Sequence, residues 1–248
     1  VETVNDALYC FDKIKSGIKK PSISLKAIGH SISNRNEKQK TELGAKHGYA
    51  ISQGVALAKD LGNLPANICT PGYLAKIAKK LSASQKNLKT QILNEPEMKK
   101  LGMGSLLSVT AGATEPGKMI VMQYKGGGKS KPIVLVGKGV TFDTGGISLK
   151  PGARMDEMKF DMCGAASVIG AMLAISSIKL KINLTIIVPA VENMPAGNAT
   201  RPGDIVKSMS GQTIEVLNTD AEGRMILCDS LTFARKFKPT AIIDVATL

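Results

Sequence analysis

The chain has 248 residues, of which 43% are hydrophobic and 4% aromatic, and its 33 basic and 20 acidic residues give a formal net charge of +13. This composition excludes an intrinsically disordered chain, because enough apolar residues are present to bury a core, and the four cysteines are too few for a disulfide scaffold. The length accommodates one large domain or two modest ones.

The first part of the chain predicts the end of one domain followed by a connecting helix. Apolar residues recur with helical spacing from Glu2 to Lys15, residues 22–28 are typical of a short strand, and a second helical pattern runs from about Glu37 to Leu61. Pro71 then opens a helix that reaches Leu81. The predicted units are the end of an N-terminal α/β domain (1–35), a connecting helix (36–62) and the first part of a larger domain (63–248).

Further along, β-branched apolar runs alternate with helical patterns. The predicted strands are residues 118–124, 131–137, 182–190 and 240–248, and the predicted helices are residues 163–178 and 224–237. This alternation indicates an α/β fold with a mixed, largely parallel sheet and helices on both faces. Ligands of such sheets bind beyond the carboxyl ends of the strands.

Three features of the sequence concern the extent of the chain and the compartment of the protein. The chain begins at Val1 without a secretion signal and ends in an apolar strand-like run, so we expect a fragment cut at both ends. The uncharged run Met162–Ile178 predicts a buried helix rather than a membrane span. Four widely spaced cysteines and two histidines exclude a zinc finger and favour reduced thiols in the cytoplasm.

The positive charge is unevenly distributed. Residues 1–150 carry 23 basic and 10 acidic side chains, whereas residues 151–248 carry 10 of each. One interpretation is a surface for nucleic acid or acidic lipid. A solvated lysine-rich surface is favoured, because no tight basic run occurs and few aromatic residues are available to stack on bases.

Three acidic segments lie at predicted strand ends or helix starts. Lys138, Asp143 and Lys150 lie in GKGVTFDTGGISLKP (137–151), and Asp161 lies in KFDMCG (159–164). Asp220 and Glu222 lie two residues apart in NTDAEGR (218–224), so an extended chain would point both carboxylates the same way.

Each of these residues also has a structural explanation. Asp161 alone is favoured as a helix N-cap, and Asp143 as a turn residue. The two lysines could be solvated surface residues, and Glu222 with Arg224 could be first-turn helix residues. Together, however, four carboxylates require neutralisation, and with two histidines in the chain the ligands of a cation would be mainly oxygen. The hypothesis is a pair of divalent metal ions that activates a bridging water for hydrolysis.

These strings closely resemble those of the leucine aminopeptidase (cytosol aminopeptidase) family, bacterial type, with similar intervals between them. The resemblance extends from about His47 to Leu248, and more weakly through the N-terminal part. It implies that residues 63–248 are the first part of a metallo-aminopeptidase catalytic domain. It also implies a chain about twice this length.

The resemblance implies a role for each matching residue. Asp143, Asp220 and Glu222 would surround one metal ion, and Lys138, Asp143, Asp161 and Glu222 the other, with Lys138 as a neutral amine. Lys150 would stabilise the oxyanion, and Arg224 would hold a bicarbonate ion that acts as general base. The substrate would contact Met158, Thr247 and Leu248.

The predicted function is therefore a metal-dependent aminopeptidase that removes Leu-like N-terminal residues from peptides in the cytoplasm, as a homo-hexamer with no membrane partner. Mn²⁺ is the expected metal, with Zn²⁺ or Mg²⁺ as alternatives. Two other hypotheses remain open. One is a DNA-binding accessory role of the basic N-terminal part, and the other is a truncated chain that binds metal without catalysis.

Overall fold

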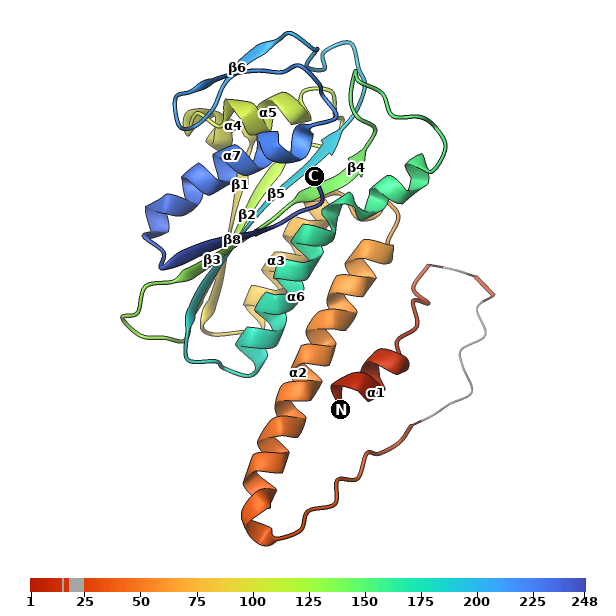
Figure 1. Ribbon diagram of the computed structural model, residues 1–248, viewed down its shortest axis with the longest axis vertical. Coiled ribbons are helices and arrows are strands. Elements are labelled where there is room, and N and C mark those ends of the chain that lie inside the picture. Colours follow the sequence, from red (N-terminus) through yellow and green to blue (C-terminus); the bar gives the residue numbers. More distant parts are fainter. Residues whose placement is uncertain (15, 18–24) are drawn as a thin grey trace.

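The computed structural model describes residues 1–14, 16–17 and 25–248 of the chain. Figure 1 shows a twisted sheet flanked by helices, with the long helix α2 extending well beyond it and α1 lying beside α2. The described helices are α1 (Glu2–Ala7), η1 (Arg35–Glu37), α2 (Lys38–Asn63), α3 (Pro71–Ala83), α4 (Glu95–Lys100), α5 (Gly104–Thr110), η2 (Met155–Met162), α6 (Cys163–Ser177), α7 (Glu222–Ala234) and η3 (Arg235–Phe237), where η marks a 3₁₀ helix. The described strands are β1 (Leu88–Asn94), β2 (Lys118–Lys125), β3 (Ile133–Gly137), β4 (Gly139–Asp143), β5 (Asn183–Asn193), β6 (Ile205–Lys207), β7 (Thr213–Glu215) and β8 (Ala241–Val245).

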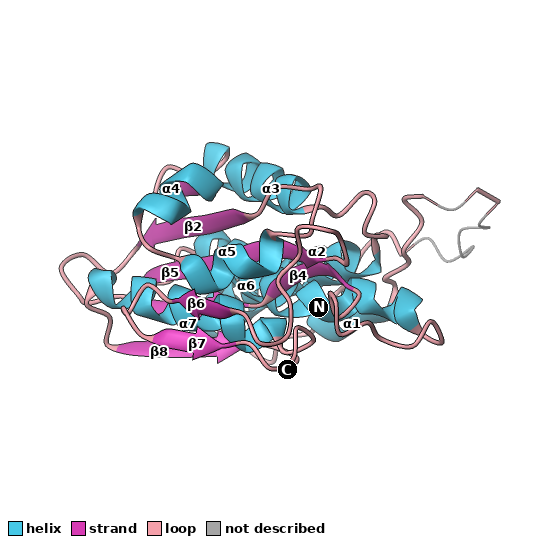
Figure 2. Ribbon diagram, turned by 90° about the horizontal axis from the view of Figure 1, so that it is seen from above, coloured by secondary structure: helices cyan, strands magenta, loops and turns pink. Residues whose placement is uncertain are grey.

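In the described part of the chain, six strands form the main sheet. Its order is β1-β2-β5-β3-β8, and β4 also pairs with β5. Seen from above, β2, β5 and β8 follow one another across the molecule (Figure 2). The pairs β1–β2 and β2–β5 are antiparallel, whereas β3, β4, β5 and β8 run parallel, so the predicted mixed, largely parallel sheet is confirmed.

The central strands are buried on both faces, which explains their uninterrupted apolar sequences. In β2, Ile120 and Met122 pack with α3 and α6, whereas Met119 and Val121 point to the opposite face, which α5 and α7 cover. Strand side chains alternate between faces, so one short run supplies both cores. The predicted helices on both faces are confirmed.

Helices α2 and α6 cross at two glycines. A Cβ atom on Gly54 would lie 2.5 Å from the carbonyl oxygen of Gly170, and one on Gly170 would lie 2.4 Å from that of Gly54. No larger residue fits either position, because the two backbones are in direct contact.

Two elements near the N-terminus differ from those that the sequence predicts. Within the described part of the helix predicted from Glu2 to Lys15, only Glu2–Ala7 is helical, and Tyr9 beyond it donates a hydrogen bond to Asp60 of α2. Of the predicted strand at 22–28, residues 22–24 lie outside the described residues, and 25–28 form no strand. The connecting helix is α2, although the division into domains stays a prediction.

One stretch of the described residues, Met155–Ser177, is long and apolar enough to cross a membrane by length and composition alone. Its main part, α6, packs against α2 and the sheet, and Ile169 and Met172 are fully buried. Such packing is expected of a core helix, as the uncharged run predicts.

Candidate functional site

The candidate site lies at the carboxyl edge of the parallel strands. Asp143 ends β4, Lys138 follows β3, and Thr247 follows β8. Glu222 is the first residue of α7. Together with residues of η2 they line a cavity of about 350 Å³, where ligands of α/β sheets are expected to bind.

Lys138 reaches the cavity because it interrupts a strand. Residues before it pair with Leu184–Ile187 of β5 and residues after it pair with Ala190–Asn193, while its own N–H donates to the carbonyl of Val245 at 3.0 Å. The carbonyl of Lys138 accepts from the N–H of Ala165 at 2.8 Å. The residue is therefore tied to β8 and α6 rather than to β5.

The Lys138 half of the site consists of Lys138, Asp161, Glu222 and Thr247. Lys138 Nζ lies 2.8 Å from Asp161 Oδ1 and 2.8 Å from Glu222 Oε1, and donates to the Thr247 carbonyl at 2.5 Å. Thr247 Oγ1 also donates to Asp161 Oδ1 at 2.7 Å. The Lys138 side chain is 4% exposed, so these contacts lie in a largely desolvated environment.

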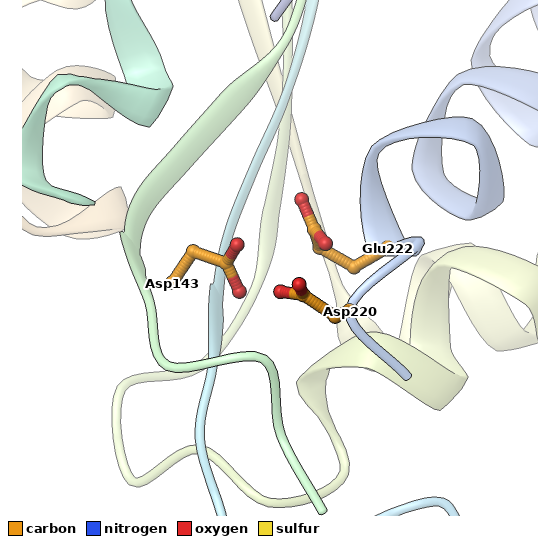
Figure 3. Close-up of side chains that lie close together, drawn as sticks. All are labelled: Asp143, Asp220 and Glu222. Atoms are coloured by element: carbon orange, nitrogen blue, oxygen red, sulfur yellow. The ribbon is translucent and has the colours of Figure 1, made fainter. Parts of the chain in front are cut away.

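The Lys150 half consists of Lys150, Asp143 and Asp220, and it is more open. Lys150 Nζ lies 2.9 Å from Asp143 Oδ2 and 2.5 Å from Asp220 Oδ1, and its side chain is 22% exposed. Ligand oxygens of Asp143, Asp220 and Glu222 lie within 4.8 Å of one another, so the two halves adjoin. Figure 3 shows the three side chains converging: Asp143 from the end of β4, Glu222 from the start of α7, and Asp220 from the segment just before that helix.

Two glycines allow other parts of the chain to approach closely around Lys138. A Cβ atom on Gly223 would lie 2.9 Å from Lys138 Nζ and 2.7 Å from Leu248 Cδ2. One on Gly164 would lie 2.1 Å from the Val245 carbonyl oxygen and 2.9 Å from the Lys138 nitrogen. Gly164 is thus the point where the backbones of α6, β8 and the β3–β4 connection meet.

Burial and charge shift the pKa values in the Lys138 half. Burial, with the nearby Asp143 charge, raises the pKa of Glu222 to about 7, although the hydrogen bond from Lys138 acts in the opposite direction. Burial also raises the pKa of Asp161. Burial lowers the pKa of Lys138, but hydrogen bonds to Asp161 and Glu222 outweigh it, so the net shift is upward and the group is an ammonium.

The pKa of Lys150 shifts in the same direction. Burial lowers it, and the hydrogen bonds to Asp220 and Asp143 raise it by more, so the net shift is upward. Both lysines therefore carry a positive charge among the carboxylates at neutral pH.

The structure decides between several of the alternatives. Asp161 lies in η2 and does not cap α6, whose N-cap is Met162, so the N-cap interpretation is wrong. Lys138 is not a surface residue, and Glu222, which does lie in the first turn of α7, is buried against it. Asp143 is the last residue of β4, and its Oδ1 accepts from the Gly145 N–H at 2.9 Å, so it both ends a strand and begins the turn that was expected of it.

The remaining predicted residues lie around the cavity. Met158, Arg224, Thr247 and Leu248 all line it, Arg224 with an exposed side chain. Phe160, which the sequence analysis did not single out, lines it as well.

Asn193 was also missed. It is the last residue of β5 and is buried, and its Nδ2 donates to Asp143 Oδ1 at 2.8 Å and to the Thr219 carbonyl at 3.0 Å. The signal that could have found it is its position at a strand end beside Asp143, which required knowing that β4 and β5 pair.

The donor set fits hard divalent cations. Three of the four carboxylates are buried or nearly so, and Asp161 Oδ2 is buried with no hydrogen-bond partner among the described residues. An unsatisfied buried carboxylate oxygen is costly, and a cation would compensate that cost. The acidic cluster therefore has the chemistry of a metal site.

Comparison with known proteins agrees with this geometry. The profile described as "Cytosol aminopeptidase family, catalytic domain" matches residues 56–248. The chain belongs to the cytosol aminopeptidase family. The resemblance seen in the three sequence segments is thereby confirmed.

Several relatives are similar over nearly the whole chain. Proteins named probable cytosol aminopeptidase are 61% identical over 98% of this chain in Dechloromonas aromatica, 58% over 99% in an Azoarcus species and 57% over 99% in Paraburkholderia phytofirmans. The matched regions make up 49%, 49% and 48% of those proteins, so the chain spans about half the length of these relatives. The comparisons give no support to the DNA-binding alternative.

Proposed function

We propose that the protein containing this chain is a dinuclear metal-dependent aminopeptidase that removes the N-terminal residue, preferably a Leu-like one, from peptides. The observation that carries the proposal is the convergence of Asp143, Asp220 and Glu222 beside two lysine–carboxylate clusters in one cavity of the family's catalytic domain.

The ligands follow from the two halves of the site. Asp143, Asp220 and Glu222 would hold one ion, and Lys138, Asp143, Asp161 and Glu222 the other, with Asp143 and Glu222 shared. The raised pKa of Lys138 describes an ammonium facing carboxylates, whereas ligation needs the neutral amine. Divalent charge beside Nζ would favour that neutral form.

When bound, two divalent cations supply Lewis acidity and an activated water. Side chains of the protein would stabilise the developing charge and hold the general base. The Lys150 ammonium, the more exposed of the two, would stabilise the negative charge that develops on the scissile carbonyl oxygen. Arg224, at the exposed rim, would hold a bicarbonate ion that accepts the proton from the attacking water.

Met158 and Phe160 give the cavity an apolar wall for the side chain of the first substrate residue. A hydrophobic wall of this kind discriminates by about 1–3 kcal/mol per methylene, so the Leu preference should be moderate. Thr247 and Leu248 would contact the substrate through their own backbones.

Oxygen-rich ligation favours Mn²⁺, with Zn²⁺ or Mg²⁺ as alternatives. A homo-hexamer in the cytoplasm, acting on peptides and without a membrane partner, completes the proposal. These features rest on the family resemblance alone.

The test is hydrolysis of leucine p-nitroanilide by the whole protein, with Mn²⁺ and with a chelator. Asp220→Ala and Glu222→Ala should each lower kcat by at least about a thousandfold and abolish Mn²⁺ binding, because each removes a charged ligand. Glu215→Ala, which removes an exposed carboxylate of β7, is the matched control and should have no effect. Turnover retained in chelator or in either site variant would overturn the proposal.

A further inference from the structure

We infer that Asn193 is a positioning residue that holds the two ligand-bearing segments of the site in register and selects which oxygen of Asp143 faces the cation. The inference rests on the proposed function, because it concerns the metal site of the aminopeptidase.

The first argument is that one amide group joins two separate segments. Asn193 Nδ2 donates to Asp143 Oδ1 at 2.8 Å, at the end of β4, and to the Thr219 carbonyl at 3.0 Å, directly before Asp220. An amide carries two N–H donors on one nitrogen, and both are used here. Through this one group, the distance between Asp143 and Asp220 is defined by hydrogen bonds.

The second argument concerns the orientation of the Asp143 carboxylate. Its Oδ1 accepts two hydrogen bonds, from Asn193 Nδ2 at 2.8 Å and from the Gly145 N–H at 2.9 Å. Its Oδ2 faces Lys150 Nζ at 2.9 Å. With Oδ1 engaged by two donors, Oδ2 is the oxygen left for a cation.

The third argument is that Asn193 itself is held tightly. Its backbone carbonyl accepts from the Thr144 N–H at 3.0 Å and from Thr144 Oγ1 at 2.8 Å. A Cβ atom on Gly146 would lie 2.8 Å from Asn193 Oδ1, so the amide fits against a position where only glycine leaves room. A side chain fixed on both sides can orient its neighbour, as outer residues of metal sites commonly do.

Thr219 extends this support. Its Oγ1 donates to the Gly145 carbonyl at 2.6 Å and accepts from the Ser148 N–H at 2.8 Å. The two loops are thus joined at Thr219 as well as at Asn193, but the bond to a ligand carboxylate comes from Asn193.

The experiment measures Mn²⁺ affinity by calorimetric titration of the whole protein and its Asn193→Leu variant, which keeps the branched shape of the side chain but removes both donors. The visible absorption spectrum of the Co²⁺-loaded protein reports ligand geometry independently of activity. Loss of a second-layer hydrogen bond to a metal ligand typically weakens affinity about 10–100-fold. We expect a loss in that range and an altered Co²⁺ spectrum.

Asn183 is the matched control, because it opens the same strand and also holds a loop through its side chain. Its amide accepts from the Gly127 N–H at 3.0 Å and donates to the Ser130 carbonyl at 2.7 Å, at the opposite end of β5. Asn183→Leu should lower the unfolding midpoint and leave Mn²⁺ affinity and the Co²⁺ spectrum unchanged.

Affinity within twofold of wild type in Asn193→Leu, or an equal loss in Asn183→Leu, would overturn the inference. If Asn193→Leu does not fold, Asn193→Ser, which keeps one donor and creates less strain, is judged by the same criteria. Absence of Mn²⁺ binding by the wild-type protein would overturn the proposed function itself, which is a different result from binding that is insensitive to Asn193.

Discussion

The two lysines of the site lie in contrasting environments. The Lys138 side chain is 4% exposed and its Nζ contacts two carboxylates and a backbone carbonyl, whereas the Lys150 side chain is 22% exposed and its Nζ contacts two carboxylates. Lys138 interrupts a sheet strand, while Lys150 follows a glycine-containing loop.

This difference suggests different chemical roles for one residue type. A lysine enclosed by fixed partners can act as a ligand, because its amine has little freedom to leave. A lysine facing a cavity can contact a substrate, because solvent and substrate both reach it. The following predictions test whether burial separates the two roles.

The largest expected effect is on stability. Lys138→Met leaves Asp161 and Glu222 buried without their shared cation, which should cost about 3–5 kcal/mol in the metal-free protein. Lys150→Met removes two ion pairs of a partly exposed lysine, but Asp143 keeps two hydrogen bonds, so the cost should be smaller, about 1 kcal/mol. Urea unfolding in chelator measures both values, and equal losses would abolish the distinction between the two lysines.

A smaller loss of stability is expected from a substitution that fills the space beside Lys138 and leaves the charges in place. Gly223→Ala places a methyl group within 2.9 Å of Lys138 Nζ, so this side chain must shift away from Asp161 or Glu222. Overpacking of this kind costs about 1–3 kcal/mol. Gly152→Ala, where a Cβ atom would meet nothing within 4 Å, should leave stability unchanged. The same unfolding measurement compares them, and a neutral Gly223→Ala would show that Lys138 is not tightly held.

The smallest effect is on the pH dependence of metal binding. With a pKa of about 7, Glu222 gains a proton as the pH falls below 7, and a protonated carboxyl no longer attracts a cation. Binding through a neutral Lys138 also displaces a proton, so Mn²⁺ affinity should fall with decreasing pH throughout, and by up to about tenfold more per unit below pH 7 than above it. Calorimetric titrations at pH 6, 7 and 8 would show it, and a slope that does not steepen below pH 7 would exclude Glu222 as a titrating ligand.

Much of the fold could be predicted from sequence because its central strands are apolar throughout. The predicted strands correspond to β2, β3, β5 and β8, and the long helices α2, α3, α6 and α7 were also predicted. Strand β1 was missed because polar residues such as Lys89 and Gln91 alternate along it. Strand β4 was missed because its glycine and threonine residues are also typical of loops.

The candidate site was predictable to the extent that it lies in contiguous segments. The structure brings Lys138, Asp143, Asp161, Asp220 and Glu222 into one cavity, as the resemblance implied, although their roles as ligands stay a proposal. Asn193 could not be predicted, since an asparagine at a strand end has no local signature. Its partners follow only from the pairing of β4 with β5.

Gly164 has a consequence for how the site tolerates mutation elsewhere. The backbones that carry Lys138, Asp161 and Thr247 meet there without an intervening side chain. Their spacing is therefore set by peptide dimensions, which sequence change does not alter, rather than by the sizes of core residues. Substitutions in the two cores could accumulate over evolutionary time while these three residues keep their separation.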